Sequence, residues 1–291
     1  MSLLADSNQR AEILKGGSAK QSLQLLPLRH TKVVHFVRHG EGFHNLVGDY
    51  DNWDYVDAHL TEAGWQQARK LREHIQSLPD SLQLQAVVIS PLTRAIETAI
   101  GAFGGGAWTS ADSDKPLMLA QEAVKSKRAE HTAVSSAGCP PFIIHEGCRE
   151  QLGKNPCDKR INIQELRMRY PAIDFTLVED DDDVLWVPER RETNEELLQR
   201  SAAFAQWLMD RPESRLAVVT HSSFLYHLMA NFGQQAAQPI ADEMHRWYNN
   251  CEFRSLVLSD PSNGHDFPDP YHSLGNTPAA EKDIVIADHI C

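Results

Sequence analysis

The stretch His35–Asn45, HFVRHGEGFHN, decides the fold of this chain, because an apolar segment changes there abruptly into basic residues and glycines. Residues 32–37, KVVHFV, are rich in β-branched and aromatic side chains and predict a buried strand. Arg38 and His39 follow directly, with two glycines close behind. Such residues can belong to the core or to a charged loop, but they can also bind a phosphate group beside a nucleophilic imidazole. The rest of the sequence has to decide between these interpretations.

Apolar strands and amphipathic helices alternate along the remaining chain. The predicted strands after the first are 84–90, 141–146, 215–220 and 253–259. The predicted helices are 60–78, 90–103, 193–210 and 224–233. Ser90 is expected to cap the second of these helices, and Thr193 opens the third with a capping-box pattern. Continuous apolar strands alternating with helices predict an α/β fold, a three-layer α/β/α sandwich around a mostly parallel sheet.

The composition divides the chain into one ordered domain and two termini. Residues 1–30 are expected to be a mobile leader, and 260–291, rich in Pro, Gly, Asp and Asn, a loosely ordered tail. The domain between them, 31–259, is expected to carry inserts near 43–60, 104–140 and 155–190. The length of 291 residues is ample for one large core.

Bulk properties exclude several classes of partner. The formal net charge is −12, which argues against a nucleic-acid backbone or an anionic membrane as the main partner. No secretory signal or transit peptide is expected, and the apolar runs are too short to span a bilayer. Five cysteines do not suggest a disulfide framework, so a cytoplasmic location is expected. The oligomeric state stays open.

Three predicted strand ends carry basic and hydroxyl residues. The motifs are RHGE after the first strand, SPLTR after the second and THSS after 215–219. Ligands of open α/β sheets bind beyond the carboxyl ends of the strands, so Arg38, His39, Arg94 and His221 are expected to converge there. Arginine matches phosphate oxygens with a planar fork of donors, and histidine can be a neutral nucleophile. This combination favours phosphoryl transfer through a phosphohistidine, without a metal or another cofactor.

Together these motifs resemble the histidine phosphatase superfamily, which is also called phosphoglycerate mutase-like. The resemblance rests on RHGE with Asn45 downstream, LTEAGWQQA, SPLTRAIETA and THSS, and it extends from about Thr31 to Ser223. The segments LLPLRHTKVVHFVRHGEGFHN, DAHLTEAGWQQA and CREQLGKNPCDKR are similar to the eukaryotic branch of plant and fungal phosphoglycerate mutase-like proteins. The resemblance implies the phosphoglycerate mutase-like version of the α/β/α fold.

The resemblance also implies roles for individual residues. His39 matches the histidine that accepts the phosphoryl group, and Arg38, Arg94 and His221 match the rest of its phosphate site. Asn45 matches a polar residue that contacts substrate.

The family's general acid is a glutamate in a short motif of the type RE…G. CREQLG places Glu150 in this role, although the commoner motif has one more residue before the glycine. Glu146, in HEG, is the competing candidate. The alternative for either residue is a helix-capping or surface carboxylate.

The implied function is a metal-independent phosphatase that hydrolyses a small phosphorylated metabolite through a phosphohistidine on His39. One alternative is a phosphoglycerate-type phosphomutase, but the acid motif of the type ER-H-Y-G that the glycolytic mutases carry is absent. The other is a non-catalytic module that binds phosphorylated ligands. Against that reading, both histidines, both arginines and a carboxylate remain in the sequence.

Several further residues admit two interpretations. Lys159 and Arg160 can contact a second anionic group of the substrate, or they can form a surface pair or a loop salt bridge. The run Asp180–Asp183 is expected to be a solvated loop rather than a cation site. Cys148 and Cys157 lack the C-x-x-C spacing of a zinc site, so no metal is expected there.

Overall fold

The computed structural model describes residues 31–78, 82–120, 127–233 and 236–259. Within these residues, a central sheet has the strand order β5-β2-β6-β1-β7. Its strands are β1 (Thr31–Arg38), β2 (Ala86–Ile89), β5 (Phe142–Ile144), β6 (Arg215–Thr220) and β7 (Phe253–Ser259). The first four strands run parallel, and β7 pairs antiparallel with β1 at the edge. The predicted mostly parallel sheet is therefore confirmed.

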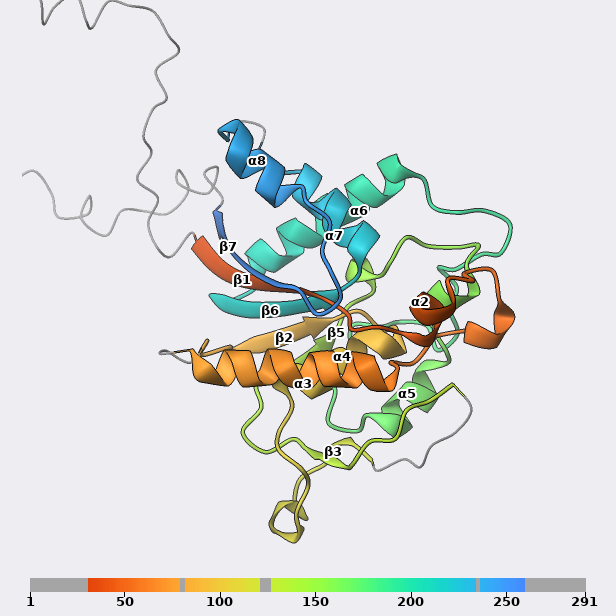
Figure 1. Cartoon of the computed structure of the whole chain (residues 1–291), viewed down its shortest axis with the longest axis vertical. Helices are drawn as coiled ribbons and strands as arrows, with labels where there is room; N and C mark the ends of the chain where they lie inside the picture. The colour runs from red at the N-terminus through yellow and green to blue at the C-terminus, as the bar shows by residue number, and fades with distance from the viewer. Residues whose placement is uncertain (1–30, 79–81, 121–126, 234–235, 260–291) are drawn as a thin grey trace, which may run out of the picture.

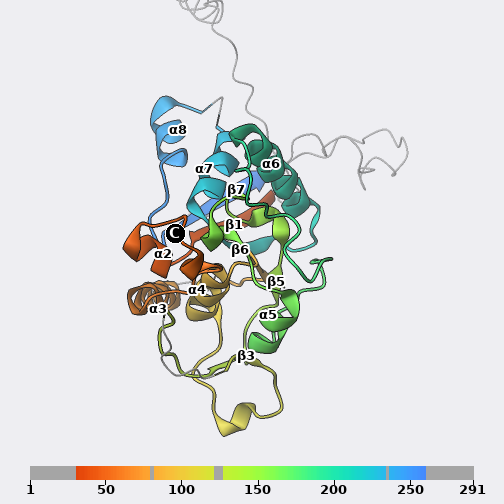
Figure 2. The same cartoon turned by 90° about the vertical axis from the view of Figure 1, so that its right-hand side faces the viewer.

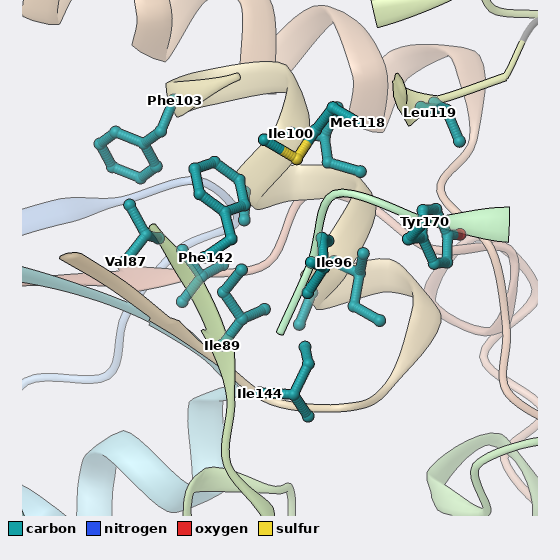
Figure 3. Close-up of a cluster of buried hydrophobic side chains, with 14 of the residues drawn as sticks. Val87, Ile89, Ile96, Ile100, Phe103, Met118, Leu119, Phe142, Ile144 and Tyr170 are labelled. Carbon is teal, nitrogen blue, oxygen red and sulfur yellow. The ribbon is translucent and has the colours of Figure 1, made fainter. Parts of the chain in front are cut away.

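Helices cover both faces of this sheet. α3 (Glu62–Ser77) and α4 (Thr93–Phe103) lie on one face, and α6 (Asn194–Asp210) and α7 (Ser222–Ala230) lie on the other (Figure 1). A separate apolar core fills each interface. The core under α4 contains Ile96, Ile100 and Phe103 packed against side chains of β2 and β5 (Figure 3). The predicted three-layer α/β/α sandwich is confirmed.

Helix starts follow local capping chemistry. The Thr193 hydroxyl accepts from the Glu196 amide while the Glu196 carboxylate accepts from the Thr193 amide, which confirms the predicted capping box of α6. The expected cap of α4 was wrong. That helix begins at Thr93 with Leu92 as its N-cap, and the Thr93 amide donates to the Asp57 carboxylate at 2.7 Å. The Ser90 hydroxyl lies before the helix, where it is bonded to the His221 ring.

Smaller elements occupy the segments between the main strands and helices. They are α2 (Phe43–Val47), α5 (Ile163–Arg169), α8 (Gln238–Met244), β3 (Leu117–Leu119), β4 (Val134–Ser135), and the 3-10 helices η2 (Trp53–Tyr55), η3 (Ser110–Asp112), η4 (Glu146–Cys148) and η5 (Pro156–Asp158). β3 lies on the far side of α4 from the sheet (Figure 2). The predicted leader, 1–30, and tail, 260–291, lie outside the described residues. Among the residues described, no helix combines the length and apolar character needed to cross a bilayer.

Candidate active site

The carboxyl ends of three neighbouring strands meet at one edge of the sheet. Arg38, the last residue of β1, lies opposite Thr220, the last residue of β6. The next amide along β1, that of His39, donates to the Thr220 carbonyl at 2.8 Å, and the Ser90 amide continues the pairing of β2 with β6. His39, Ser90 and His221 therefore leave the sheet beside one another, as expected from the parallel topology.

The His39 ring has one nitrogen fixed and one nitrogen facing Arg94. Its Nδ1 lies 2.6 Å from the Gly40 carbonyl oxygen, which can only accept, so Nδ1 carries the proton. Nε2 therefore holds the lone pair, and the Arg94 Nε–H points to it at 3.4 Å. The side chain is 2% exposed, and its ring centroid lies 5.1 Å from that of His221. The tautomer of His39 thus suits nucleophilic attack through Nε2.

The Arg94 guanidinium is held from both sides in the first turn of α4. Nη1 donates to the Cys157 carbonyl at 2.6 Å, and Nη2 donates to Asp158 Oδ1 at 2.7 Å. The other Asp158 oxygen accepts from Arg191 at 2.7 Å. Because Nη1 and Nη2 are both bonded to this segment, and Arg191 holds Asp158 in turn, the Nε–H of Arg94 keeps its direction toward His39.

Arg38 supplies a second guanidinium at the end of β1. Its Nη1 donates to the Tyr248 carbonyl at 2.8 Å, whereas its buried Nε has no hydrogen-bond partner in the structure. A buried N–H group without a partner is rare in proteins, and a bound oxyanion would satisfy it. The positive charge of Arg38 also acts on the His39 ring.

The His221 ring also has one nitrogen with a partner and one without. Nε2 lies 2.7 Å from the Ser90 hydroxyl oxygen, and Nδ1 is buried without a partner. His221 is the N-cap residue of α7 and is fully buried. Nδ1 of His221 and Nε of Arg38 are thus two buried, unsatisfied nitrogens at the candidate site.

Both histidines are neutral at neutral pH in this environment. Burial lowers the pKa of His39 well below its usual value, and the nearby charges of Arg94 and Arg38 lower that pKa further. Burial, followed by the charge of Arg94, does the same to the pKa of His221. A nucleophilic imidazole must be unprotonated at the attacking nitrogen, so the lowered pKa of His39 suits that role.

The two candidate general acids have different surroundings. Glu150 lies against the start of α7, where its oxygens accept from the amides of Ser223 and Phe224, both at 3.2 Å. The negative charge of Glu150 acts on the Arg38 guanidinium. Glu150 is thus close to the strand ends that carry Arg38 and His221.

Glu146 is instead committed to two arginines. Its carboxylate accepts from Arg160 Nε at 2.7 Å and from Arg149 Nη1 at 3.0 Å. These contacts place Glu146 in an ion-pair network, so the geometry favours Glu150 as the carboxyl group beside the substrate.

Asn45 lies in α2, six residues after His39. Its Oδ1 accepts from the Gly42 amide at 3.1 Å and closes the first turn of this short helix. The role of Asn45 in substrate contact stays a prediction.

Comparisons with known proteins show the family of this chain. The model of the histidine phosphatase superfamily, branch 1, matches residues 34–111, a segment that contains His39 and Arg94. The phosphoglycerate mutase-like protein of Arabidopsis thaliana is 39% identical over 264 residues, which are 89% of this chain and 96% of that protein. The chain belongs to the histidine phosphatase superfamily. Phosphoglycerate mutase-like protein 1 of Arabidopsis thaliana is 42% identical over 243 residues, 82% of this chain and 85% of that protein.

This chain is also similar in structure to a putative α-ribazole-5′-P phosphatase from Escherichia coli. Its TM-score is 0.48 at 18% identity, with 78% of this chain and 91% of that chain covered.

Sequence reasoning gave no role to two residues that the structure places near the candidate site, one beside His39 and one beside Arg94. His44, on α2, is 3% exposed, and its ring centroid lies 5.8 Å from that of His39. Asp158 holds the Arg94 guanidinium from a 3-10 helix 64 residues further along the chain. Neither residue has a spacing that signals its position, because both are placed by contacts between segments that are distant in the sequence.

The predicted acidic run is exposed over 180–182, as expected, but its last residue, Asp183, belongs to a buried network. The Asp183 carboxylate is buried and bonds both nitrogens of the Arg149 fork at 2.7 and 2.6 Å. The Arg160 guanidinium donates to the backbone carbonyls of residues 180, 181 and 182. The expectation of a solvated loop was therefore wrong for Asp183, and Arg160 is a structural residue. In the described part of the chain, no cluster of His, Cys, Asp and Glu side chains has the makings of a metal site.

Lys159 differs from its neighbour Arg160. Its Nζ lies 5.2 Å from the centroid of the Trp186 ring and 5.9 Å from that of the exposed Trp53. No ion-pair partner of Lys159 is found among the described residues. Lys159 directly follows Asp158, the residue that holds Arg94, so this cation lies on the segment next to the candidate phosphate site.

Proposed function

We propose that this protein is a metal-independent phosphatase that hydrolyses a small phosphomonoester through a phosphohistidine on His39. One observation carries the proposal. The His39 ring has its Nδ1 proton committed to a backbone carbonyl, and its Nε2 lone pair, which faces the Arg94 Nε–H at 3.4 Å, is the one available for attack. Arg38 and His221 add donors without partners on the same strand ends.

In the first half of the reaction, His39 Nε2 attacks the phosphorus atom in line with the ester oxygen. The N–P bond forms as the P–O ester bond breaks, and the leaving oxygen takes the proton of the Glu150 carboxyl group. Arg38 and Arg94 stabilise the negative charge on the transferred phosphoryl oxygens. General acid catalysis of this kind contributes about 10²- to 10⁴-fold to the rate.

In the second half, water attacks the phosphorus atom of the phosphohistidine. The N–P bond breaks, the ionised Glu150 takes a proton from the water, and inorganic phosphate leaves. His39 returns to its neutral form with the lone pair on Nε2. The buried, arginine-rich surroundings that lower the pKa of His39 also keep the ring unprotonated for the next cycle.

A phosphomutase is the second candidate, because the Arabidopsis relatives are named phosphoglycerate mutase-like. The two reactions share the phosphohistidine and differ in the acceptor of the phosphoryl group. A mutase requires a second phosphorylated molecule to reload His39, whereas a phosphatase uses water. An assay for isomerised product in the presence of a bisphosphate therefore separates the two.

The test combines turnover with trapping of the intermediate. The wild-type protein should hydrolyse 4-nitrophenyl phosphate. When the reaction is quenched with base instead of acid, which would cleave a phosphohistidine, the protein should carry phosphate on one residue. His39→Ala should lose both signals, while His74→Ala, at an exposed position on α3, should keep both. Turnover by His39→Ala above one-thousandth of the wild-type rate would overturn the assignment. A phosphoenzyme that releases phosphate only to a second substrate would favour the mutase.

A further inference from the structure

A third imidazole, that of His44, lies among the groups assigned to phosphate binding. Its ring centroid is 5.8 Å from that of His39, only slightly further than the 5.1 Å between His39 and His221. The side chain is 3% exposed, and Tyr50 packs edge-on against its outer side at 5.8 Å. His44 therefore faces the strand ends rather than solvent.

The short helix that carries His44 has a fixed position. The Phe43 amide donates to the His59 carbonyl at 3.0 Å, and Gly42 forms a β-bridge with Leu60. A Cβ atom at Gly42 would lie 2.7 Å from the His44 ring, so only glycine allows the ring to pack there. The backbone of the GFHN turn therefore determines where this imidazole lies.

The polar chemistry of His44 is incomplete in the structure. Its Nδ1 is buried and has no hydrogen-bond partner among the described residues. Burial lowers the pKa of His44 well below its usual value, and the charges of Arg94 and Arg38 lower it further. The ring is consequently neutral, with one N–H donor and one lone pair.

A core histidine would be expected to satisfy its nitrogens within the protein. His35 is such a residue, because its Nδ1 lies 2.8 Å from the Ser255 hydroxyl oxygen within the sheet. His44 lacks any such partner, although it is equally buried, and an unpaired buried polar group costs free energy unless a ligand satisfies it. The 5.8 Å between the His39 and His44 ring centroids places His44 beside the same strand ends.

We propose that His44 is a third imidazole of the phosphate site, and that its ring N–H donates a hydrogen bond to an oxygen of the phosphoryl group bound at His39. This inference rests on the proposed function, because it assumes that a phosphoryl group occupies the space between Arg38, Arg94 and His221. A neutral donor adds a contact to the phosphoryl group without adding a further positive charge beside two arginines. His44 is then a substrate-contacting residue that none of the four superfamily motifs identifies.

The first experiment compares a variant that keeps the size of the side chain with variants that keep an N–H donor. His44→Leu removes both nitrogens, His44→Asn retains an amide near the position of Nδ1, and His44→Gln retains one near Nε2. The affinity for inorganic phosphate and for orthovanadate is measured by calorimetry for each, with His74→Leu as the control at an exposed site. His44→Leu should weaken phosphate binding about 10- to 100-fold, and at least one amide variant should recover most of this loss.

Equal affinities of wild type and His44→Leu would overturn the proposal, as would equal losses in all three variants, which would indicate packing alone. Thermal unfolding verifies that each variant is folded. The second experiment needs no variant: in the ¹⁵N-histidine spectrum of the wild type, the N–H proton of His44 should become visible and protected when phosphate is added. An unchanged His44 signal at saturating phosphate would refute the contact. Because both experiments measure binding, they stay decisive even if the protein proves not to hydrolyse phosphomonoesters.

Discussion

The Nε2 atom of His221 lies 2.7 Å from the hydroxyl oxygen of Ser90, which joins the residue after β6 to the residue after β2. When the hydroxyl donates to Nε2, the proton of the neutral imidazole resides on Nδ1, the atom that has no partner in the protein. We expect Ser90 to favour this tautomer, in which His221 can donate from Nδ1 to a phosphoryl oxygen.

Ser90→Ala should therefore weaken catalysis without removing any group that contacts the substrate. We expect kcat/KM for 4-nitrophenyl phosphate to fall about tenfold, which corresponds to the loss of one neutral hydrogen bond. Ser201→Ala is the matched control, because Ser201 is also fully buried and donates to the Leu198 carbonyl within α6. Similar kinetics in the two variants would exclude the tautomer role of Ser90.

The two glutamates near η4 should respond differently to removal of their charge. Glu150→Gln should slow hydrolysis of alkyl phosphates about 100-fold or more and hydrolysis of 4-nitrophenyl phosphate much less, because nitrophenolate leaves without a proton. Glu146→Gln should lower thermal stability, since it breaks ion pairs with Arg149 and Arg160, and should not discriminate between leaving groups. A larger leaving-group effect at Glu146 would reverse the assignment.

Lys159 should contribute to the binding of substrates that carry a second negative charge. The cation lies near two indole rings and has no carboxylate partner among the described residues, so its charge is available to a ligand. Lys159→Ala should raise KM about tenfold for phosphomonoesters that also carry a carboxylate or a second phosphate. KM for 4-nitrophenyl phosphate should not change. Lys154→Ala, on the same loop, serves as the control, and an equal effect of both variants would contradict a specific contact.

Stability should fall as the pH is lowered through the range below about 6.5. Burial lowers the pKa of His39, His44 and His221 in the folded state, so below about pH 6.5, the usual histidine value, the unfolded chain binds more protons. The stabilisation is complete above this pH and is lost as the pH falls toward the lowered values. Each histidine contributes up to about 1.4 kcal/mol per pH unit.

Urea unfolding at pH 7.5, 6.5 and 5.5 measures this dependence. His44→Gln should reduce the slope of the unfolding free energy against pH, whereas His74→Gln, at an exposed site, should leave the slope unchanged. Carboxylates contribute equally to the wild type and both variants, so the difference isolates the buried ring. A slope that His44→Gln does not alter would show that His44 is not a buried neutral base.

Much of the fold was predictable because its signals are local. Alternating apolar strands and amphipathic helices determined the sheet and its two layers, and the parallel topology then placed Arg38, His39 and His221 at one edge. Arg94 was found from its place just after β2. The roles of these residues stay predictions, although their positions agree with the proposed chemistry.

The remaining site residues depend on contacts between distant segments. The Ser-Pro pattern favours a helix cap at Ser90, but the Ser90 hydroxyl is hydrogen-bonded to the ring of His221, 131 residues further along the chain. A run of four aspartates gives no reason to single out Asp183. In the structure it is the only one of the four whose carboxylate bonds the buried Arg149. His44 resembles any polar residue in a turn until Tyr50 and the neighbouring strand ends enclose it.

The way in which Arg160 holds the segment 180–182 has a consequence for how this loop can vary. Toward this segment the guanidinium donates to peptide oxygens, while its carboxylate contact is with Glu146, so the grip of Arg160 does not depend on the identity of these three side chains. Asparagine or serine could replace the exposed aspartates while the loop kept its path. Insertion or deletion of one residue, in contrast, would shift every carbonyl out of alignment with the arginine. Loop length, rather than loop charge, is the property that this chain has to preserve here.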